Sequence, residues 1–514
     1  MKERITYIHG AGDAFEPSQL QVEKTSLVVK NLQAAREDRL TFDIDELPHE
    51  IKLILSQLED FHLRWSSATF YPLASPFHSR ISPGLHIFLT PKQNASLDRL
   101  CPLLKKAFGE PLKCTSVQES FTNKNVTSPA TLRATPLEYY QNLESLAEFE
   151  AYAEHVLCGS EPGSNSCLNR LRVIAIATEV DLDYDGKDRT FIIRAYQDGV
   201  TRSSSGWSRA DSLSGSLKTE IGLLSPQAAT EVDHIRLEGY LIELGDDQKT
   251  KSTLIQFPSR HHSLPGWNYS AFFSEPSGMH PKLRIRLEAS QSAFPPTANP
   301  ESCSLNTYLT LPSSIFPDKY QLANELLLAS LNLRSLRSIS GYTDLEAPDY
   351  ATFKWGSNIL IELEPSHKGE HKVSTTWVAE IPLHLRYLPP TKSSQGLSHI
   401  NIPWPVVFWT CTANSNIGKL SGNPFDKTDL GYDKHFDDRT IFYHIQPNSP
   451  NGDLQNTLYV PVLDTSVLGK DLSYLELGTG IVVLAGWLWI VWLLFRGWYW
   501  TNQPFHTVTQ KKKV

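Results

Sequence analysis

The stretch IPLHLRYLPP, Ile381 to Pro390, sets a histidine and an arginine into an otherwise apolar run. Side chains along a β-strand point alternately to its two faces, so His384 and Arg386 would share one face. That polar face belongs either to a catalytic site or to the outer surface of a scaffold. The opposite face of such a strand, which we expect in a core, consists of Ile381, Leu383, Leu385 and Tyr387.

Similar runs surround this stretch and predict the fold of the last third of the chain. Across residues 300–465, short apolar and aromatic segments alternate with turn signals, which is typical of an antiparallel β-sandwich. The Pro-rich connector Ala293 to Ser302 separates this predicted domain from the preceding residues. The strand-like runs are SLNTYLTLP, NILIELEP, STTWVAEIPLHLRYL, PVVFWTC and TIFYHI.

The first 292 residues are less regular. Residues 1–157 have the pattern of a mixed α/β region, and residues 158–292 that of a β-rich region. Apolar residues at helical spacing predict one helix from Asp45 to Trp65 and a second over Pro136 to Leu157. The chain as a whole is therefore expected to be mainly β with some α.

One segment near the carboxyl end is suited to lipid. Residues 477–495, LGTGIVVLAGWLWIVWLLF, form a run of nineteen residues without a charge. As a helix this run is about 28 Å long, close to the ~30 Å hydrocarbon core of a bilayer. Trp498, Tyr499 and Trp500 follow it and fit an interfacial aromatic belt. We predict one transmembrane helix over residues 477–495.

The flanking charges predict the orientation of this helix. The tail, residues 496–514, carries four basic residues and no acidic one, which favours the cytoplasmic side. The body would then lie in the lumen. Lys511 and Lys512, in the final KKKV, resemble a dilysine retrieval signal of the endoplasmic reticulum membrane; the alternative is a plain basic stop-transfer flank. The first twenty residues show no apolar signal-peptide region, so translocation is expected to depend on the C-terminal helix.

Cysteines and sequons fit a lumenal body. Three N-x-S/T sequons begin at Asn94, Asn125 and Asn268 and are candidate glycosylation sites. Cys158 and Cys167 bracket a Ser/Gly-rich loop and are a candidate disulfide. The spacing leaves the full connectivity open, and free buried thiols are the alternative. The remaining cysteines are Cys101 and Cys114, a second local candidate pair, and the distant Cys303 and Cys411.

The segment DLDYDGKD, Asp181 to Asp188, has the strongest metal-binding pattern. Its three alternate aspartates and its glycine match the opening of a calcium loop, and they also contain the D-x-D of many glycosyltransferases. The twelfth position, however, is Ile192, where the calcium loop needs a bidentate glutamate. Acidic residues and glycine between two strands are also what a hairpin turn prefers, and we favour that interpretation.

Other reactive side chains form no recognisable constellation. HKGEH, His367 to His371, fits a zinc pattern that requires a helix, but Pro365 and Gly369 favour a hairpin tip. The segment Arg260 to His262 is expected to be a solvated loop. The sequence contains no nucleophile elbow and no P-loop, and its net charge of −8 argues against a general nucleic-acid binder. We expect no catalytic or metal site.

The order of several short motifs resembles the PIG-X family, and within it the fungal protease-B-nonderepressible proteins. The resemblance covers about residues 300–497, and the first 290 residues are similar to the longer fungal arrangement. The motifs, in chain order, are LPSSIFPDKYQLA (311–323), DLEAPDY (344–350), WGS (355–357), IPLHLRYLPP (381–390), PVVFWTC (405–411) and YVPV (459–462).

This resemblance implies a function without an active site. Members of the family are non-catalytic subunits of the endoplasmic reticulum enzyme that adds the first mannose to the GPI-anchor precursor. A multi-span partner carries the chemistry; the subunit stabilises it, with a wider role in lumenal folding, and uses no cofactor. His384 and Arg386 would then be a structural pair or a partner-facing surface. A general lumenal chaperone or carbohydrate-binding module, and a cryptic metal-dependent enzyme using Asp181, Asp183 and Asp185, are the alternatives.

Overall fold

A computed structural model describes most of the chain. Met1–Tyr387 together with Ile400–Leu458 form one compact unit, and Leu388–His399 together with Tyr459–Val514 form a second. The described residues are 1–10, 19–22, 26–123, 135–158, 164–199, 207–212, 219–228, 233–244, 251–275, 278–289, 295, 302–345, 347–365, 376–391, 396–413, 420, 422–465 and 471–501.

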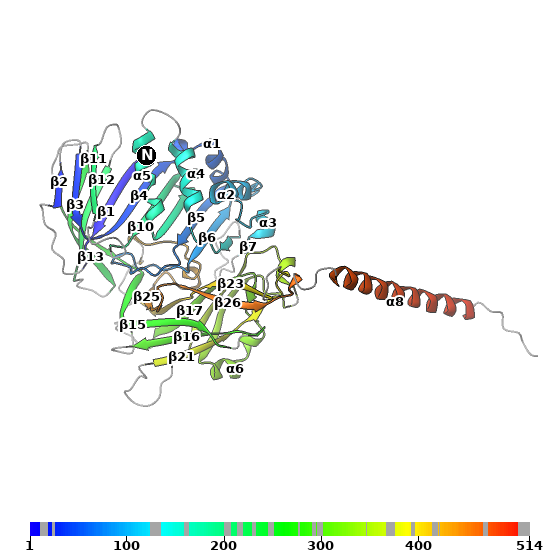
Figure 1. The fold of residues 1–514 in the computed structure, drawn as a ribbon. Helices are drawn as coiled ribbons and strands as arrows, with labels where there is room; N and C mark the ends of the chain where they lie inside the picture. The colour runs from blue at the N-terminus through cyan, green and yellow to red at the C-terminus, as the bar shows by residue number, and fades with distance from the viewer. Residues whose placement is uncertain are drawn as a thin grey trace, which may run out of the picture. The chain divides into compact units, whose positions relative to one another are not determined.

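An eleven-stranded sheet organises the first half of the first unit (Figure 1). Its neighbouring strands are antiparallel except for the parallel pair β1 and β12. In spatial order its strands are β14 (Lys251–Pro258), β13 (His234–Leu244), β12 (Thr219–Gln227), β1 (Lys2–Ile8), β4 (Ala35–Asp43), β10 (Thr190–Gln197), β9 (Glu179–Asp185), β5 (Leu58–Ser66), β6 (Gly84–Pro91), β8 (Leu137–Gln141) and β7 (Thr122–Asn123).

Helices cover one face of this sheet. In α2 (Leu100–Phe108), the buried side chains recur at helical spacing, so the helix presents an apolar stripe to the strands. That stripe joins Phe61, Leu63 and Trp65 of β5 in one core. The other helices of this half are α1 (His49–Leu55), α3 (Val117–Ser120), α4 (Ala147–Cys158) and α5 (Ser164–Leu171).

Both helices expected in this region are shorter than the spacing of apolar residues predicts. The helix expected from Asp45 to Trp65 ends at Leu55, and β5 begins at Leu58. The helix expected over Pro136 to Leu157 is β8 followed by α4. In both places the chain pairs with neighbouring strands of the eleven-stranded sheet, so sheet formation overrides a local helical spacing.

An eight-stranded sheet organises the second half of the first unit (Figure 1). It is antiparallel except for the parallel pair β15 and β25. Two of its strands precede the Pro-rich connector, so residues on both sides of that connector share one sheet. In spatial order the strands are β19 (Leu333–Gly341), β20 (Gly356–Leu363), β17 (Cys303–Pro312), β24 (Val406–Thr412), β25 (Thr440–Pro447), β15 (His261–Phe273), β16 (Lys282–Ala289) and β21 (Thr376–Pro382).

The second face of the eleven-stranded sheet packs toward the eight-stranded sheet. Phe88 of β6 shares a core cluster with Phe408 of β24 and Phe442 of β25, whereas its neighbours Ile87 and Leu89 lie in the helix-side core. Helices, one sheet and a second sheet therefore form three layers. The fold is mainly β with some α and antiparallel-rich sheets, as the sequence predicts.

Shorter elements complete the first unit. Three strands, β2 (Leu20–Val22), β3 (Ser26–Leu32) and β11 (Trp207–Ser212), form a small sheet. The pair β18 (Ile315–Phe316) and β22 (His384–Leu385) joins two segments that are far apart in the sequence. A second pair consists of β23 (Leu397–Pro403) and β26 (Gln455–Pro461), and α6 (Glu325–Ser330) precedes β19.

All six cysteines form disulfide bonds. The structure joins Cys158 to Cys167 and closes a short loop between α4 and α5. A second bond within the helical layer joins Cys101 to Cys114. The third bond, Cys303 to Cys411, links β17 to its neighbour β24, where the two residues are direct cross-strand partners. The described chain therefore contains no free thiol.

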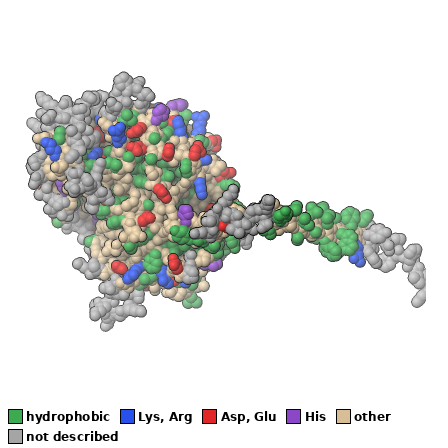
Figure 2. All heavy atoms as spheres, viewed as in Figure 1, with side chains coloured by type: hydrophobic (Ala, Val, Ile, Leu, Met, Phe, Trp, Pro, Cys, Tyr) green, Lys and Arg blue, Asp and Glu red, His purple; other side chains and the backbone are tan. Residues whose placement is uncertain are grey.

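The second unit carries α8 (Asp471–Thr501), which includes the predicted span 477–495. Its segment Ser473–Trp498 is long and apolar enough to cross a membrane, with a mean hydropathy of 2.1. Figure 2 shows hydrophobic side chains over the described length of this helix. Such a helix, exposed all round, fits a single-pass membrane protein.

Candidate functional site

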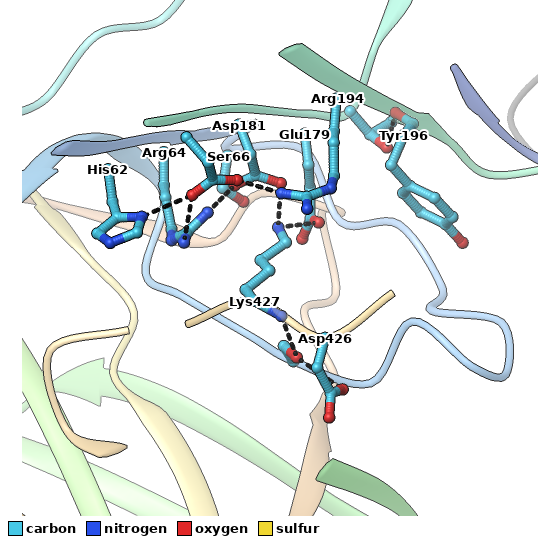
Figure 3. Close-up of polar contacts among 12 residues, drawn as sticks. His62, Arg64, Ser66, Glu179, Asp181, Arg194, Tyr196, Asp426 and Lys427 are labelled. Atoms are coloured by element: carbon cyan, nitrogen blue, oxygen red, sulfur yellow. Dashed lines mark hydrogen bonds and ion pairs between the residues drawn. The ribbon is translucent and has the colours of Figure 1, made fainter. Parts of the chain in front are cut away.

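The aspartates of the D-x-D pattern lie on β9, a strand of the eleven-stranded sheet. Asp181 is buried and Asp183 is largely buried, and both lie within ion-pair distance of Arg64 on β5. Figure 3 shows the side chain of Asp181 close to that of Arg64. Asp185 is exposed at the end of the strand, where its carboxylate accepts a hydrogen bond from the Lys187 N–H at 2.7 Å. The three carboxylates therefore do not converge on one point.

Cationic side chains surround the two inner carboxylates. Arg64 Nη1 lies 3.0 Å from Asp181 Oδ1, and its Nη2 lies 3.0 Å from Asp183 Oδ1. Arg194 of β10 pairs with Asp183 from the other side. His62 Nδ1 contacts Asp183 Oδ1 at 2.7 Å. Fixed positive charges thus occupy the positions in which a metal ion would have to bind.

A loop between β24 and β25 completes this buried charge network. Figure 3 shows Lys427 reaching from the loop toward Glu179 and Asp181, while Asp426 points away. Lys427 Nζ lies 3.2 Å from Asp181 Oδ2 and also pairs with Glu179. The guanidinium of Arg64 donates to the carbonyl oxygen of Thr428. The network therefore fastens the second half of the unit to the first.

The pKa values of the network follow from its burial and its pairing. Burial alone would lower the pKa of His62, but Asp183 and Asp429 outweigh it and raise that pKa to about 9. His62 Nε2 lies 3.1 Å from Asp429 Oδ2, so the imidazolium bridges two carboxylates. Burial works against the ionised form of Asp183, but Arg64 and Arg194 hold its pKa well below the usual range.

This network is suited to holding structure. Its carboxylates are paired with fixed cations, and the lowered pKa of Asp183 keeps that carboxylate from being poised near neutral pH as a general base. Among the described residues, no group of three or more His, Cys, Asp or Glu side chains has the geometry of a metal site. HKGEH, residues 367–371, lies outside the described residues. In the sequence, this network is indicated only by His62 and Arg64, which alternate with the apolar Leu63 and Trp65 in β5.

The segment Arg260 to His262, expected to be a solvated loop, instead leads into β15. His261 is buried and its Nδ1 lies 2.9 Å from His444 Nε2. Its ring stacks on Phe442 with the centroids 4.8 Å apart. Burial lowers the pKa of His261 well below its usual value, so this histidine is neutral. The loop prediction was wrong because the strand pairing that buries these residues involves β25, about 180 residues away.

Arg386 is the centre of a second polar cluster. Its side chain is only 2% exposed and lies over the ring of Phe316, 4.1 Å from the ring centroid. The guanidinium donates to backbone carbonyl oxygens on two other segments. These acceptors are Ser313 at 3.0 Å, Ala347 at 2.8 Å, Tyr342 at 3.3 Å, and Asp344.

Residues of four sequence motifs meet around this arginine. Ser313 Oγ donates to Asp349 Oδ1 at 2.6 Å, and the Asp349 N–H donates to the carbonyl oxygen of Tyr387 at 3.0 Å. Gly356 has a φ of +148°, and a Cβ there would lie 2.1 Å from the carbonyl oxygen of Leu311. The motif segments 311–323, 344–350, 355–357 and 381–390 therefore build one platform, which we call the Arg386 platform.

The two polar residues of the opening stretch differ in their surroundings. His384 is half-buried; its Nε2 contacts Gln321 Oε1 at 3.1 Å and its Nδ1 contacts His280 Nδ1 at 3.0 Å. Arg386 points inward and presents almost no surface, because the backbone carbonyls that it binds surround it. Of the apolar set, Ile381, Leu383 and Leu385 are buried as expected.

Tyr387, the fourth member of that apolar set, does not lie in the core. Its side chain is 71% exposed. The regular alternation ends at β22, which covers only His384–Leu385, so the next side chains no longer follow the two faces of a strand. The core assignment of Tyr387 was therefore wrong.

The candidate modification and targeting residues fall in different parts of the chain. Asn94 is exposed in a turn with a φ of +61°, and Asn268 is exposed on β15. Asn125 lies outside the described residues, as do Lys511 and Lys512. The structure thus describes two of the three sequons, and both present their side chains to solvent.

Comparison with known proteins relates the whole chain to one family. The sequence model of the PIG-X / PBN1 family matches residues 276–495, which include the Arg386 platform and most of α8. Protein pbn1 of Emericella nidulans is 40% identical, with 96% of this chain and 95% of that protein covered. Protein pbn1 of Aspergillus oryzae is 37% identical over the full length of both. Protein pbn1 of Neurospora crassa is also 37% identical, over 96% and 95%.

These similarities extend through the eleven-stranded sheet that precedes the matched segment, and they confirm the resemblance that the motifs indicate. The chain belongs to the PIG-X / PBN1 family.

Proposed function

We propose that this protein is a non-catalytic, stabilising subunit of the endoplasmic reticulum mannosyltransferase that adds the first mannose to the GPI-anchor precursor. The observation that carries the proposal is membership of the PIG-X / PBN1 family over nearly the whole chain. Family membership links the chain to GPI-anchor biosynthesis. We infer the accessory role and the identity of the enzyme from that resemblance.

The arrangement of charged groups supports an accessory role. The D-x-D aspartates, which could have held a metal and a sugar diphosphate, are instead locked to Arg64, Arg194 and Lys427. A divalent cation would have to displace these side chains and leave buried cations unpaired, at a cost of several kcal/mol. In our proposal the chemistry resides in a multi-span partner, and this chain supplies folded surface.

Stabilisation of a partner then follows from mass action. A subunit that binds only the folded partner shifts its folding equilibrium, by about 2.7 kcal/mol at a hundredfold excess over the dissociation constant. The candidate span confines both proteins to one membrane, which raises their effective concentration. Of the two residues expected at a partner surface, only His384 retains exposed surface, so we assign it to that contact and Arg386 to its support.

The proposal also places the body in the lumen of the endoplasmic reticulum. Basic residues follow α8, and the final KKKV with Lys511 and Lys512 would serve as a retrieval signal on the cytoplasmic side. Three disulfides suit an oxidising compartment. A lumenal body would expose Asn94, Asn125 and Asn268 to the glycosylation machinery.

Affinity capture of the full chain from mild detergent tests the proposal. The expected result is one stoichiometric multi-span partner with mannosyltransferase chemistry. A broad set of unrelated lumenal clients, with no such partner, would contradict the subunit role and favour the general chaperone. Capture through His384→Ala should recover less partner than capture through wild type, whereas His399→Ala, a substitution in the other unit, serves as the matched control.

A further inference from the structure

Large hydrophobic side chains are exposed around the Arg386 platform. In the described part of the first unit after residue 300, all exposed large hydrophobic side chains lie between residues 320 and 387. They belong to three segments of the platform, to the adjoining α6, and to the short stretch 351–354 between two platform segments. Each of them is between 49% and 85% exposed. This set, which we call the apolar rim, consists of Tyr320, Leu326, Leu345, Tyr350, Phe353 and Tyr387.

The apolar rim is mounted on a stiff base. Arg386 holds the segment that carries Leu345 and Tyr350 through the carbonyl oxygens of residues 344 and 347. The hydrogen bond from the Asp349 N–H to the Tyr387 carbonyl oxygen holds the backbone segments that carry Tyr350 and Tyr387 side by side. Because the backbone of these segments is already held in place, the binding of a partner to their exposed side chains costs little backbone entropy.

The size of the rim indicates an interaction. An aromatic side chain carries about 150–250 Å² of surface, so the four aromatic residues, each about two-thirds exposed, contribute on the order of 400–700 Å². Exposed apolar residues scattered singly need no explanation, but a patch of this order marks a contact with protein, ligand or membrane.

We propose that the apolar rim rests in the headgroup region of the bilayer that α8 crosses. Immediately after Tyr387 the chain passes into the unit that carries α8. That unit also carries exposed apolar side chains outside the helix, at Leu397, Tyr459 and Leu463. The chain between Leu458 and Ser473 spans at most about 50 Å, so the first unit is held within reach of the membrane surface.

The chemistry of the rim suits the interface of a bilayer. Three of its residues are tyrosines, whose rings are apolar while their hydroxyl groups remain hydrated, and such side chains are enriched at the headgroup level. Lys319, whose Nζ lies 5.0 Å from the ring centroid of Tyr320, can reach toward the phosphates.

Charge does not drive this contact. Acidic side chains outnumber lysines near the rim, because Asp318, Glu325, Asp344 and Asp349 stand beside Lys319 and Lys354. Anionic lipids would gain nothing from such a surface, since lipid attraction of that kind needs clustered Lys or Arg. The contact is therefore hydrophobic and insensitive to salt.

Depth-dependent quenching in nanodiscs tests the inference on the full chain. All six native cysteines are in disulfides, so a single introduced cysteine can carry a fluorophore at a defined position. The test variants are Tyr387→Cys and Phe353→Cys. If one of the two variants does not fold, the other still tests the inference. The matched control is Leu254→Cys, at a 59% exposed position on β14.

Lipids that carry a nitroxide in the headgroup should abolish most of the fluorescence at positions 387 and 353, while the fluorescence at position 254 should stay unchanged. The same loss is expected in neutral and in anionic nanodiscs, at low and at high salt. Quenching at positions 387 and 353 that matches the control would overturn the inference. So would shielding that arises only when the catalytic partner is reconstituted alongside, which would assign the rim to protein docking.

The inference rests only on α8 crossing a membrane. The nanodisc contains no partner, so a negative result leaves the proposed subunit role standing. Conversely, loss of the subunit role would not remove quenching at the rim.

Discussion

The Nη1 atom of Arg386 lies 2.8 Å from the carbonyl oxygen of Ala347, in a segment that is about 40 residues away in the chain. This single side chain joins its own motif segment to two others by binding their backbone carbonyls. Arg386 is almost inaccessible to solvent, and the hydrogen bonds that it donates to these carbonyls are partly buried. Arg386 therefore acts as a structural hub and not as a general acid.

Replacement of Arg386 by methionine should destabilise the first unit. The substitution removes hydrogen bonds from a charged donor to four partly buried carbonyls, each worth about 1 kcal/mol or more, so we expect a loss of at least about 3 kcal/mol. Denaturant unfolding of the full chain in detergent measures it. Arg334→Met is the matched control, because the Arg334 side chain is 63% exposed and its surface ion pairs are worth under about 1 kcal/mol. Equal effects of the two substitutions would contradict the role assigned to Arg386.

Replacement of Lys427 by methionine should separate the loop of residues 422–438 from β9. The substitution leaves the carboxylates of Glu179 and Asp181 buried with less compensation, which typically costs about 3–5 kcal/mol. In a double-mutant cycle with Glu179→Gln, the second substitution should restore part of that loss. Strictly additive effects would show that the two side chains do not interact in solution.

Substitutions in the D-x-D pattern separate the structural role from the enzymatic alternative. Asp183→Asn should reduce protein abundance, because it breaks pairs with Arg64, Arg194 and His62. Asp185→Asn should leave abundance and GPI mannosylation unchanged, because Asp185 is exposed in a turn. Immunoblotting and inositol labelling report the two quantities. Lost mannosylation at normal abundance in the Asp185 variant would revive the metal-dependent enzyme.

Two histidines should give opposite pH dependences of stability. The pKa of His62 rises to about 9 in the fold, so its contribution is complete below the unfolded value near 6.5 and is lost as pH rises toward 9. Burial lowers the pKa of His86 to about 3, so its contribution is complete above about 6.5 and is lost as pH falls toward 3.

Unfolding midpoints across this pH range check both signs. His62→Gln should flatten the decline on the alkaline side only, and His86→Gln should flatten the decline on the acidic side only. A His62 variant that changes the acidic side instead would show that its imidazole is neutral in the fold. Tyr387→Phe, a conservative substitution at an exposed position, serves as the control.

Patterns that depend on neighbouring residues were predictable from the sequence. The apolar run 477–495 predicted the candidate span, because length and lack of charge are the features that define such a helix, and the turn-separated runs indicated a mainly β fold. The alternation of Ile381, Leu383 and Leu385 likewise placed them in a core. Failures occurred where distant segments decide the structure. Leu58 begins a strand because β6 and β9 flank it, and His261 is buried by β25.

The charge network shows the same limit. Asp181 and Asp183 were visible as a pattern, but their partners Arg64 and Lys427 are more than 110 and 240 residues away. Spacing along the chain cannot distinguish a metal site from an ion-pair network, because the counter-charges come from other elements. The sequence showed the motifs of the Arg386 platform only as separate segments. That these segments lie together became visible only in the folded structure.

The subunit role is tested most directly by inositol labelling of GPI precursors in cells depleted of this protein. Labelled glucosaminyl-phosphatidylinositol should accumulate without its first mannose, and re-expression of the wild-type chain should restore mannosylation. Normal mannosylation in cells that lack the protein would contradict the account.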